Sequence, residues 1–263
     1  MNAQTACALL SLLLLCAAPG SATERRFGFV SESSVLAAQH RELEPWVTLR
    51  SGRAGFHNRF ENRLEMEFGM TDALQAALYF NWDGQASDGP SGRAVESGLP
   101  GASVELKGRM SDGATRAFGS AWYAEVSASP IEYELEAKLI ADRRIGGLLL
   151  AANAIAEWEA EYESPGEPHQ ELKLDFVFGG SYLVAPSLSA GFEARFASVL
   201  EDGDELEHAA VFVGPVVSLL SGGWWITLSV PNQVFSPHGA TDGRLDLAEY
   251  ERLQARLLVG MQF

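Results

Sequence analysis

The stretch from Arg63 to Met70, "RLEMEFGM", decides the fold. Its apolar residues occupy every second position and would share one face of an extended strand: Leu64, Met66, Phe68 and Met70. Its charged residues alternate with them and would share the other face: Arg63, Glu65 and Glu67. A period of two is the signature of a β-strand. We therefore expect a strand that separates an apolar environment from a polar one.

The same alternation recurs along the whole chain. Strands are predicted over residues 43–51, 59–70, 73–83, 101–111, 117–128, 131–141, 147–160, 169–182, 187–200, 209–220, 223–231 and 249–263. Most of these runs are close to the ~9–11 residues that cross a bilayer as a tilted strand. A shorter apolar run at residues 27–30 is a candidate thirteenth strand. The pattern predicts an all-β fold, a single closed antiparallel β-barrel of about 12 strands.

Alternation alone does not say which face lies inside. A closed barrel of about twelve strands is too wide for side chains to fill, since about eight strands is near that limit. Short connections alternate with long polar ones, apart from a short connection at Pro130, as periplasmic turns and extracellular loops do. Aromatic residues lie toward the ends of the apolar face, namely Phe68, Trp82, Phe118, Trp158, Phe178, Trp224 and Phe263. These features favour a transmembrane barrel with its apolar face toward lipid and a polar interior.

The first 22 residues have the composition of a secretory signal peptide. They hold no charged side chain, an apolar core from Leu9 to Ala18 and a small-residue cleavage site ending at Ala22. Both cysteines, Cys7 and Cys16, lie in this segment. We therefore predict a signal peptide over residues 1–22 and a disulfide-free barrel domain over residues 23–263, exported to the cell outer membrane.

The chain ends with a final alternating run, "RLLVGMQF", whose last residue is Phe263. Such a terminal phenylalanine resembles the signal that outer-membrane barrels present to the barrel-assembly machinery. The stretches "FGFVSESSVLAAQHRELEPWVTLRSGR" and "NRFENRLEMEFGMTDALQAALYFNW" are similar to an uncharacterised family of Gram-negative outer-membrane barrels. That family is related to the phenol-degradation MetA-pathway transporters. The resemblance implies an outer-membrane location and a barrel architecture, and it supplies no functional residue.

The polar face of the predicted strands carries many charges of both signs. The predicted pore-lining residues are Arg63, Glu65, Glu67, Glu105, Lys107, Arg109, Glu132, Glu134, Glu136, Lys138, Glu157, Glu159, Glu193 and Arg195. One interpretation is a structural lattice of ion pairs that stiffens and partly plugs the barrel. The other is an acidic diffusion path that passes small neutral or cationic solutes and disfavours anions.

Two regions are apolar on both faces of their predicted strands. Six of these residues would point inward: Leu149, Ile155, Phe212, Val216, Leu220 and Trp225. They suggest an apolar strip for hydrophobic solutes, or simple packing of the wall. Pro215 lacks an N–H, so we expect a bulge or a break in strand pairing there.

The balance of acidic and basic residues restricts the classes of partner that the protein can bind. The formal charge is −16, with 35 acidic and 19 basic residues, which argues against nucleic acid. We expect outer-membrane lipid, lipopolysaccharide and a small-molecule solute instead. A structural or adhesive barrel, using acidic loops with divalent cations, fits the charge as well.

An enzyme is the remaining alternative, since it needs a nucleophile and a base held together. Ser236 lies near His238, and Ser164 near His169, but neither pair has a nucleophile elbow. His208 is likewise near acidic residues, without metal-ligand spacing. We therefore predict a non-enzymatic protein with no cofactor, metal or catalytic residue.

Overall fold

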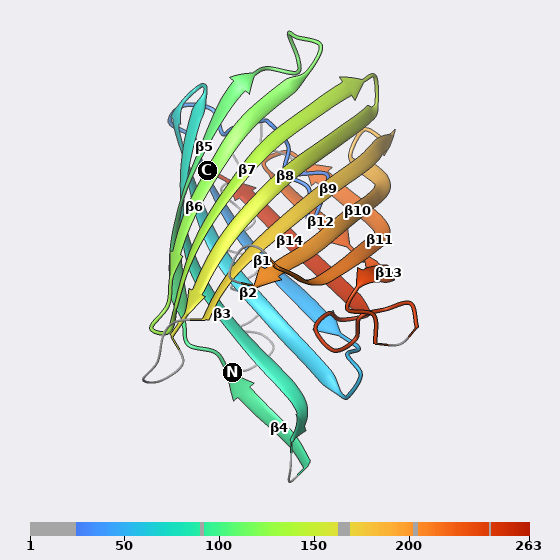
Figure 1. Ribbon diagram of the computed structural model, residues 1–263. Coiled ribbons are helices and arrows are strands. Elements are labelled where there is room, and N and C mark those ends of the chain that lie inside the picture. The colour runs from blue at the N-terminus through green and yellow to red at the C-terminus, as the bar shows by residue number, and fades with distance from the viewer. Residues whose placement is uncertain (1–24, 90–91, 163–168, 202–204, 242) are drawn as a thin grey trace, which may run out of the picture.

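Antiparallel strands make up almost all the regular structure of the protein, which a computed structural model describes over residues 25–89, 92–162, 169–201, 205–241 and 243–263 (Figure 1). The predicted signal peptide lies outside the described residues. The strands are β1 (Arg41–Ser51), β2 (His57–Thr71), β3 (Leu74–Gly89), β4 (Gly92–Ser97), β5 (Gly101–Ser111), β6 (Gly119–Ala128), β7 (Glu132–Ile145), β8 (Leu148–Glu161), β9 (His169–Ala185), β10 (Leu188–Glu201), β11 (Glu205–Ser221), β12 (Trp224–Ser229), β13 (Asn232–His238) and β14 (Leu253–Gln262). Within the described ranges, no helix is long and apolar enough to cross a membrane.

The strands close into a ring. Each wall strand pairs with its neighbours in chain order, and β1 pairs with β14 from Glu42↔Gln262 to Ser51↔Leu253. Phe263 extends this seam, because its backbone N–H donates to the Arg41 carbonyl at 2.9 Å. In the described part of the chain β12 and β13 share the neighbours β11 and β14 and so occupy one wall position, while β4 pairs only with β3. The wall therefore has twelve positions, which confirms the predicted closed barrel.

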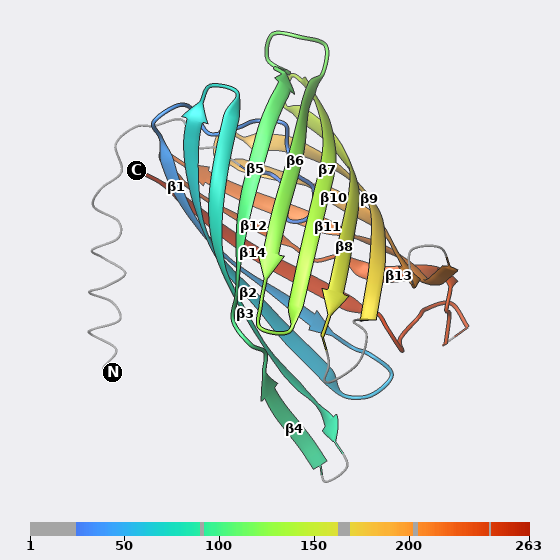
Figure 2. The ribbon, with the colours of Figure 1, turned by 60° about the vertical axis from the view of Figure 1, so that its left-hand side comes forward.

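Each of the twelve predicted ranges overlaps a strand of the wall, but two strands were not predicted. The first is β4, which folds back on the outer part of β3 and projects beyond the barrel in both views (Figures 1 and 2). The second is β13, which falls in a segment predicted to be a long loop. Both strands are short and neither shows a clear period of two, so the sequence pattern does not identify them.

The twelfth wall position is broken at Val230 and Pro231, between β12 and β13. The break lies opposite Pro215 of β11, because pairing with β11 stops at Val213↔Asn232 and resumes at Val216↔Ser229. The predicted break in pairing is therefore present. It is located on the β12–β13 side, whereas β10 pairs with β11 in register through Phe192↔Pro215.

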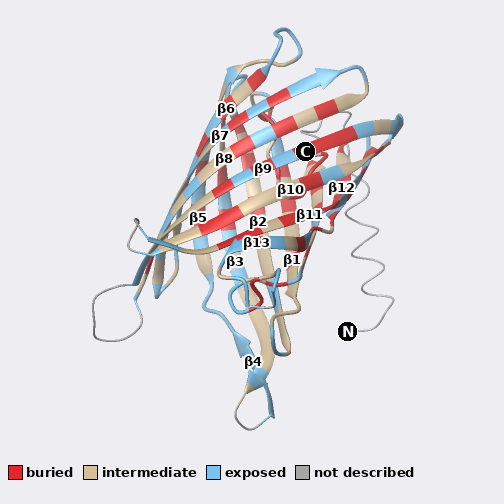
Figure 3. Cartoon of the chain, turned by 45° about the vertical axis from the view of Figure 1, so that its right-hand side comes forward, coloured by how far each residue is buried: buried red, intermediate tan, exposed pale blue. Residues whose placement is uncertain are grey.

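The barrel is inverted in polarity relative to a soluble protein. Bands of buried and exposed residues alternate along its strands (Figure 3). On the outward face Leu139 is 64% exposed and Phe176 is 60% exposed, whereas Glu65 and Glu105 in the interior are 0% and 1% exposed. Of the predicted aromatic belt, Phe118 and Phe263 lie at strand ends and are exposed, while Phe178 lies well inside β9. The predicted assignment of the apolar face to the outside is confirmed.

The two ends of the barrel differ in their connections. One end, called here the turn end, carries the turns at residues 72–73, 146–147, 186–187 and 222–223, together with residues 112–118 and Phe263. The opposite end, called the loop end, carries β4 and residues 239–252. The short connection at residues 129–131 also lies at the loop end, as predicted.

An arginine placed on the outward face should destabilise the barrel in lipid. We expect Leu139→Arg to lower the free energy of unfolding by about 2–4 kcal/mol, because Leu139 lies near the middle of β7 and a cation there meets hydrocarbon. Urea titration of the barrel in lipid vesicles measures this change. Leu139→Ala is the control and should cost less. Equal stability of the two variants would contradict a lipid-facing Leu139.

Candidate functional site in the barrel interior

An irregular segment, residues 25–38, precedes β1 and lies inside the barrel at the turn end (Figures 1 and 2). We call it the plug. The apolar run at residues 27–30 belongs to it and is not a thirteenth strand, which corrects the sequence prediction. The run is too short to extend the wall, and β1 already pairs on both sides.

Glu193 of β10 holds the middle of the plug. Its carboxylate accepts backbone N–H groups from Gly28 at 3.0 Å, Phe29 at 2.7 Å and Val30 at 2.8 Å. Hydrogen bonds to an ionised acceptor are roughly twice as strong as neutral ones. A predicted pore-lining residue therefore binds the chain's own backbone.

Three further wall side chains bond the backbone of Ser31, Ser33 and Leu36 in the plug. Asn153 of β8 accepts the Ser31 N–H at 2.7 Å and donates to the Ser31 carbonyl at 2.9 Å. Asp142 of β7 accepts the Ser33 N–H at 2.5 Å. Gln75 of β3 accepts the Leu36 N–H at 2.8 Å. Because a buried irregular backbone must find partners outside itself, these side chains make it possible for the plug to sit in the lumen.

Phe27 and Val30 anchor the plug by apolar packing. They form a buried cluster with Leu149, Val177 and Val216 of the wall, together with Ala151. Gly179 makes room for Phe27, since a Cβ at that position would lie 2.5 Å from the Phe27 ring. Part of the predicted apolar strip is thus the seat of the plug.

Three other residues of that strip are buried against further side chains of the chain. Phe212 packs against Tyr250, and Leu220 and Trp225 cluster with Leu258. Ile155 is partly buried beside the plug cluster.

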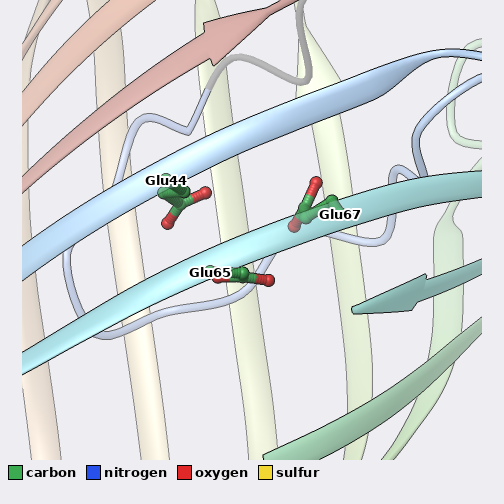
Figure 4. A group of neighbouring side chains, drawn as sticks. All are labelled: Glu44, Glu65 and Glu67. Carbon is green, nitrogen blue, oxygen red and sulfur yellow. The ribbon is translucent and has the colours of Figure 1, made fainter. Parts of the chain in front are cut away.

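Arg25, at the start of the described chain, lies among three buried carboxylates of β1 and β2. Glu44, Glu65 and Glu67 bring oxygen atoms within 4.8 Å of one another (Figure 4). Such a set could hold a hard cation. Here the Arg25 guanidinium lies 3.2 Å from Glu44, 3.6 Å from Glu65 and 3.2 Å from Glu67. The plug itself therefore supplies positive charge to this cluster.

Glu32 ties the plug to β7. Its carboxylate accepts the Arg26 N–H at 2.8 Å and pairs with the Arg144 guanidinium at 2.8 Å. Burial raises the pKa of the Glu32 carboxyl, and the Arg144 charge opposes that rise. Arg144 thus favours the ionised form of an otherwise buried acid.

Little space remains between the plug and the wall. The cavity lined by Arg25, Glu32, Gln75 and Lys107, among others, has a volume of about 10 Å³. This is about the space that one water molecule needs. The plug and the wall therefore leave room for about one water molecule at this point.

The loop-end half of the lumen is open. A cavity of about 1100 Å³ lies there, and Phe29 of the plug contributes to its lining. Fourteen carboxylates and eight lysine or arginine side chains line it in the described chain. We call it the vestibule. Eight predicted pore-lining residues line it: Arg63, Glu132, Glu134, Glu136, Lys138, Glu157, Glu159 and Arg195.

The other six predicted residues lie outside the vestibule lining. Glu65 and Glu67 contact Arg25, Glu193 holds the plug, and Glu105 and Lys107 are buried nearby. Arg109 donates to the Asp72 carbonyl at the turn end. The plug explains this division, because it covers the turn-end half of the charged face.

Ion pairs bind much of the vestibule wall together. Arg195 pairs with Asp175 at 2.6 Å, and Lys138 pairs with Glu136 at 2.8 Å. Lys173 bonds Glu157 at 3.0 Å and also contacts Glu159. Oxygen atoms of Glu132, Glu134 and Glu159 form a second group within 4.8 Å of one another. One member of this group, Glu159, is also a contact of Lys173. The predicted lattice of ion pairs is present around an open space.

The side chains considered for catalysis have other contacts. The Ser236 hydroxyl is within hydrogen-bond distance of the carbonyls of Ala209 and His238, and no bond to the His238 ring is seen in the described chain. His169 bonds Glu171 at 3.1 Å, while Ser164 lies outside the described residues. His208 bonds Asp246 at 2.9 Å.

The chain belongs to a family of unknown function, DUF6662, whose model matches residues 19–263. A comparison with curated proteins found no match.

Among solved structures the barrel is similar to the COG4313 outer membrane channel from Pseudomonas putida F1, with 10% identity, a TM-score of 0.65, and coverage of 89% of this chain and 98% of that one. It is also similar to the NanC porin, with 13% identity, a TM-score of 0.52 and coverage of 83% and 98%. The β domain of the Bordetella autotransporter BrkA matches with 11% identity, a TM-score of 0.53 and coverage of 86% and 100%. These likenesses show that the fold is that of outer-membrane barrels.

Glu193→Gln should loosen the plug without unfolding the barrel. Three backbone donors would lose an ionised acceptor, so we expect hydrogen exchange of the amides of Gly28, Phe29 and Val30 to accelerate on the order of tenfold or more. Peptide-level exchange measured by mass spectrometry reports this. Glu201→Gln, at the exposed end of the same strand, is the control. Unchanged exchange in Glu193→Gln would contradict the assigned role.

Proposed function

From the barrel interior we propose that this member of a family without an assigned role is a passive outer-membrane channel for small neutral or cationic solutes. The observation that carries the proposal is the vestibule of about 1100 Å³, open inside the barrel and lined by charge. The similarity of the fold to solved channels and porins supports the proposal.

The charge of the vestibule favours some solutes over others. With fourteen carboxylates against eight lysine and arginine side chains, the described lining disfavours anions. Ion pairs hold several carboxylates in place, so the excess charge acts as a fixed field. Neutral and cationic solutes should enter more readily than anions of the same size.

In this proposal the plug is the gate of the channel. It fills the lumen at the turn end, so a solute in the vestibule cannot continue unless the plug shifts. The plug is fixed by side-chain bonds and one apolar seat, not by strand pairing, and such contacts can be exchanged without opening the wall. We place the turn end in the periplasm and the loop end outside the cell, with export by the predicted signal peptide.

In a second version of the proposal the solute is hydrophobic, as kinship with the MetA-pathway transporters would favour. That kinship is itself a proposal. Phe27 and Val30 occupy the part of the apolar strip that contains Leu149 and Val216. Hydrophobic transport would therefore require the plug to leave its seat, with the solute replacing it there.

A structural or adhesive barrel is the second candidate, and the plug itself favours it. A lumen closed at the turn end conducts nothing as it stands. The two candidates differ in what happens when the plug is removed.

Displacing the plug should open the barrel. We expect Gly179→Leu, or removal of residues 25–38, to raise the ion conductance of the barrel in planar bilayers well above that of the unmodified protein, because the introduced leucine side chain would occupy the Phe27 seat. Gly84→Leu is the control, since its nearest contact, the Glu96 carbonyl, leaves room at 3.7 Å. If both plug variants fold and conduct no more than the unmodified protein, the channel is excluded and the structural barrel is favoured.

We also propose that the barrel-assembly machinery recognises the protein by binding Phe263. Its side chain is 56% exposed, while its backbone closes the seam with Arg41. Such a side chain is free to be bound before or during closure.

Phe263→Ala keeps the backbone and should slow insertion by purified assembly machinery several-fold, leaving spontaneous refolding in detergent unchanged. Gel mobility of the folded, unheated barrel measures both rates. Met261→Ala, on the same face of β14, is the control. Equal slowing in both assays would show a folding defect and contradict the recognition role.

A further inference from the structure

One arginine of the vestibule has neutral groups as its direct contacts. The Arg256 guanidinium of β14 donates to the Thr48 hydroxyl at 2.8 Å and to the Gly28 carbonyl at 3.3 Å. It also lies over the rings of Phe29 at 4.1 Å and Trp46 at 4.3 Å. In the described chain no carboxylate lies within salt-bridge distance of it, whereas Arg195, for example, is paired with Asp175 at 2.6 Å. Arg256 therefore lines the vestibule beside the plug without a carboxylate of the described chain in direct contact.

The opposite wall carries two carboxylates that form no salt bridge within the described ranges. Its two lysines pair with other carboxylates, Lys138 with Glu136 and Lys173 with Glu157 and Glu159. Glu132 and Glu134 of β7 have no lysine or arginine within salt-bridge distance among the described residues, although both line the vestibule. These carboxylates are partly exposed to the cavity.

The topology sets these two groups across the lumen from each other. Around the twelve wall positions, β14 and β7 are six places apart in either direction. Glu134 and Arg256 line the same cavity from these two strands. In the part of the chain that the structure describes, an arginine that forms no salt bridge thus lines the same cavity as two carboxylates that form none, from the opposite wall.

We infer that the vestibule binds a small zwitterionic solute, with its carboxylate on Arg256 and its ammonium group at Glu134 and Glu132. The inference rests on the proposed channel function and narrows the solute class. The rings of Phe29 and Trp46 offer a surface to the aliphatic part of such a solute beside the guanidinium. Thr48 and the Gly28 carbonyl hold that guanidinium in place, so it is oriented before the solute arrives.

Solutes with one kind of charge satisfy only half of this site. An anion could pair with Arg256 but would meet the carboxylate excess of the vestibule. A cation could pair with Glu134 but would gain nothing from Arg256. A zwitterion neutralises both groups and brings no net charge into the lumen, which agrees with the neutral solutes proposed above. The contact of Arg256 with Gly28 and Phe29 also places the bound carboxylate directly above the plug.

The test uses three probes of one chain length: 6-aminohexanoate, hexanoate and hexylammonium. Their affinities for the folded full-length barrel in detergent are measured by titration calorimetry. We expect 6-aminohexanoate to bind at least tenfold more tightly than either single-charge probe. Arg256→Gln should remove its advantage over hexylammonium, and Glu134→Gln its advantage over hexanoate. Arg256→Lys should keep much of the preference, because the charge remains.

Two matched controls lie outside the vestibule. Arg109→Gln removes a guanidinium at the turn end and Glu201→Gln a carboxylate at the exposed end of β10, and neither should change the order of affinities. Gel mobility of the unheated protein establishes that each variant is folded. Equal binding of the three probes by the unmodified barrel, or an unchanged preference in folded Arg256→Gln, would overturn the inference.

Uptake of the same probes into liposomes through the unmodified barrel, and through the plug-displaced barrel as a reference without the Gly28 and Phe29 contacts, separates the site from the channel. Uptake with no preference for the zwitterion, together with equal binding, leaves the channel standing and removes the site. Selective binding that depends on Arg256, without uptake of any probe, leaves the site and removes the channel.

Discussion

A chain in hydrocarbon must pair every backbone N–H and C=O within itself, and a sheet meets this requirement only by closing. The seam between β1 and β14, extended by Phe263 and Arg41, is where closure is achieved in this protein. Closure puts the apolar residues of each strand outside and the charged residues inside. It also sets a problem, because a ring of twelve strands encloses more space than its own side chains can fill.

The plug is how the chain answers that problem at one end of the barrel. A polypeptide with no regular structure can enter a lumen only if the wall supplies partners for its backbone. Glu193, Asn153, Asp142 and Gln75 provide them from four different strands. Part of the charge on the inner face therefore binds the plug. The vestibule begins beyond the plug, and Phe29 of the plug forms part of its lining.

The fold could be predicted from the sequence because alternation is local. Each strand shows its two faces within a few residues, as Leu64 and Glu65 do, and inversion followed from the width that twelve strands impose. The plug could not be predicted in this way, since its bonds join residues far apart, such as Gly28 and Glu193. The apolar run at residues 27–30 and the inward-facing Leu149 and Val216 were each visible, but nothing local says that they meet.

The sequence also does not show which charged side chains form salt bridges and which do not, because this depends on which strands lie opposite each other in the barrel. Glu134 and Arg256 are ordinary members of a charged face when each is seen on its own strand. The ring order places them on opposing walls, and Lys138, Lys173 and Glu61 each form ion pairs with other residues. The contacts of Arg256 with two rings, a hydroxyl and a carbonyl hold this guanidinium without a salt bridge to any described residue, which is the arrangement from which the zwitterion site is proposed.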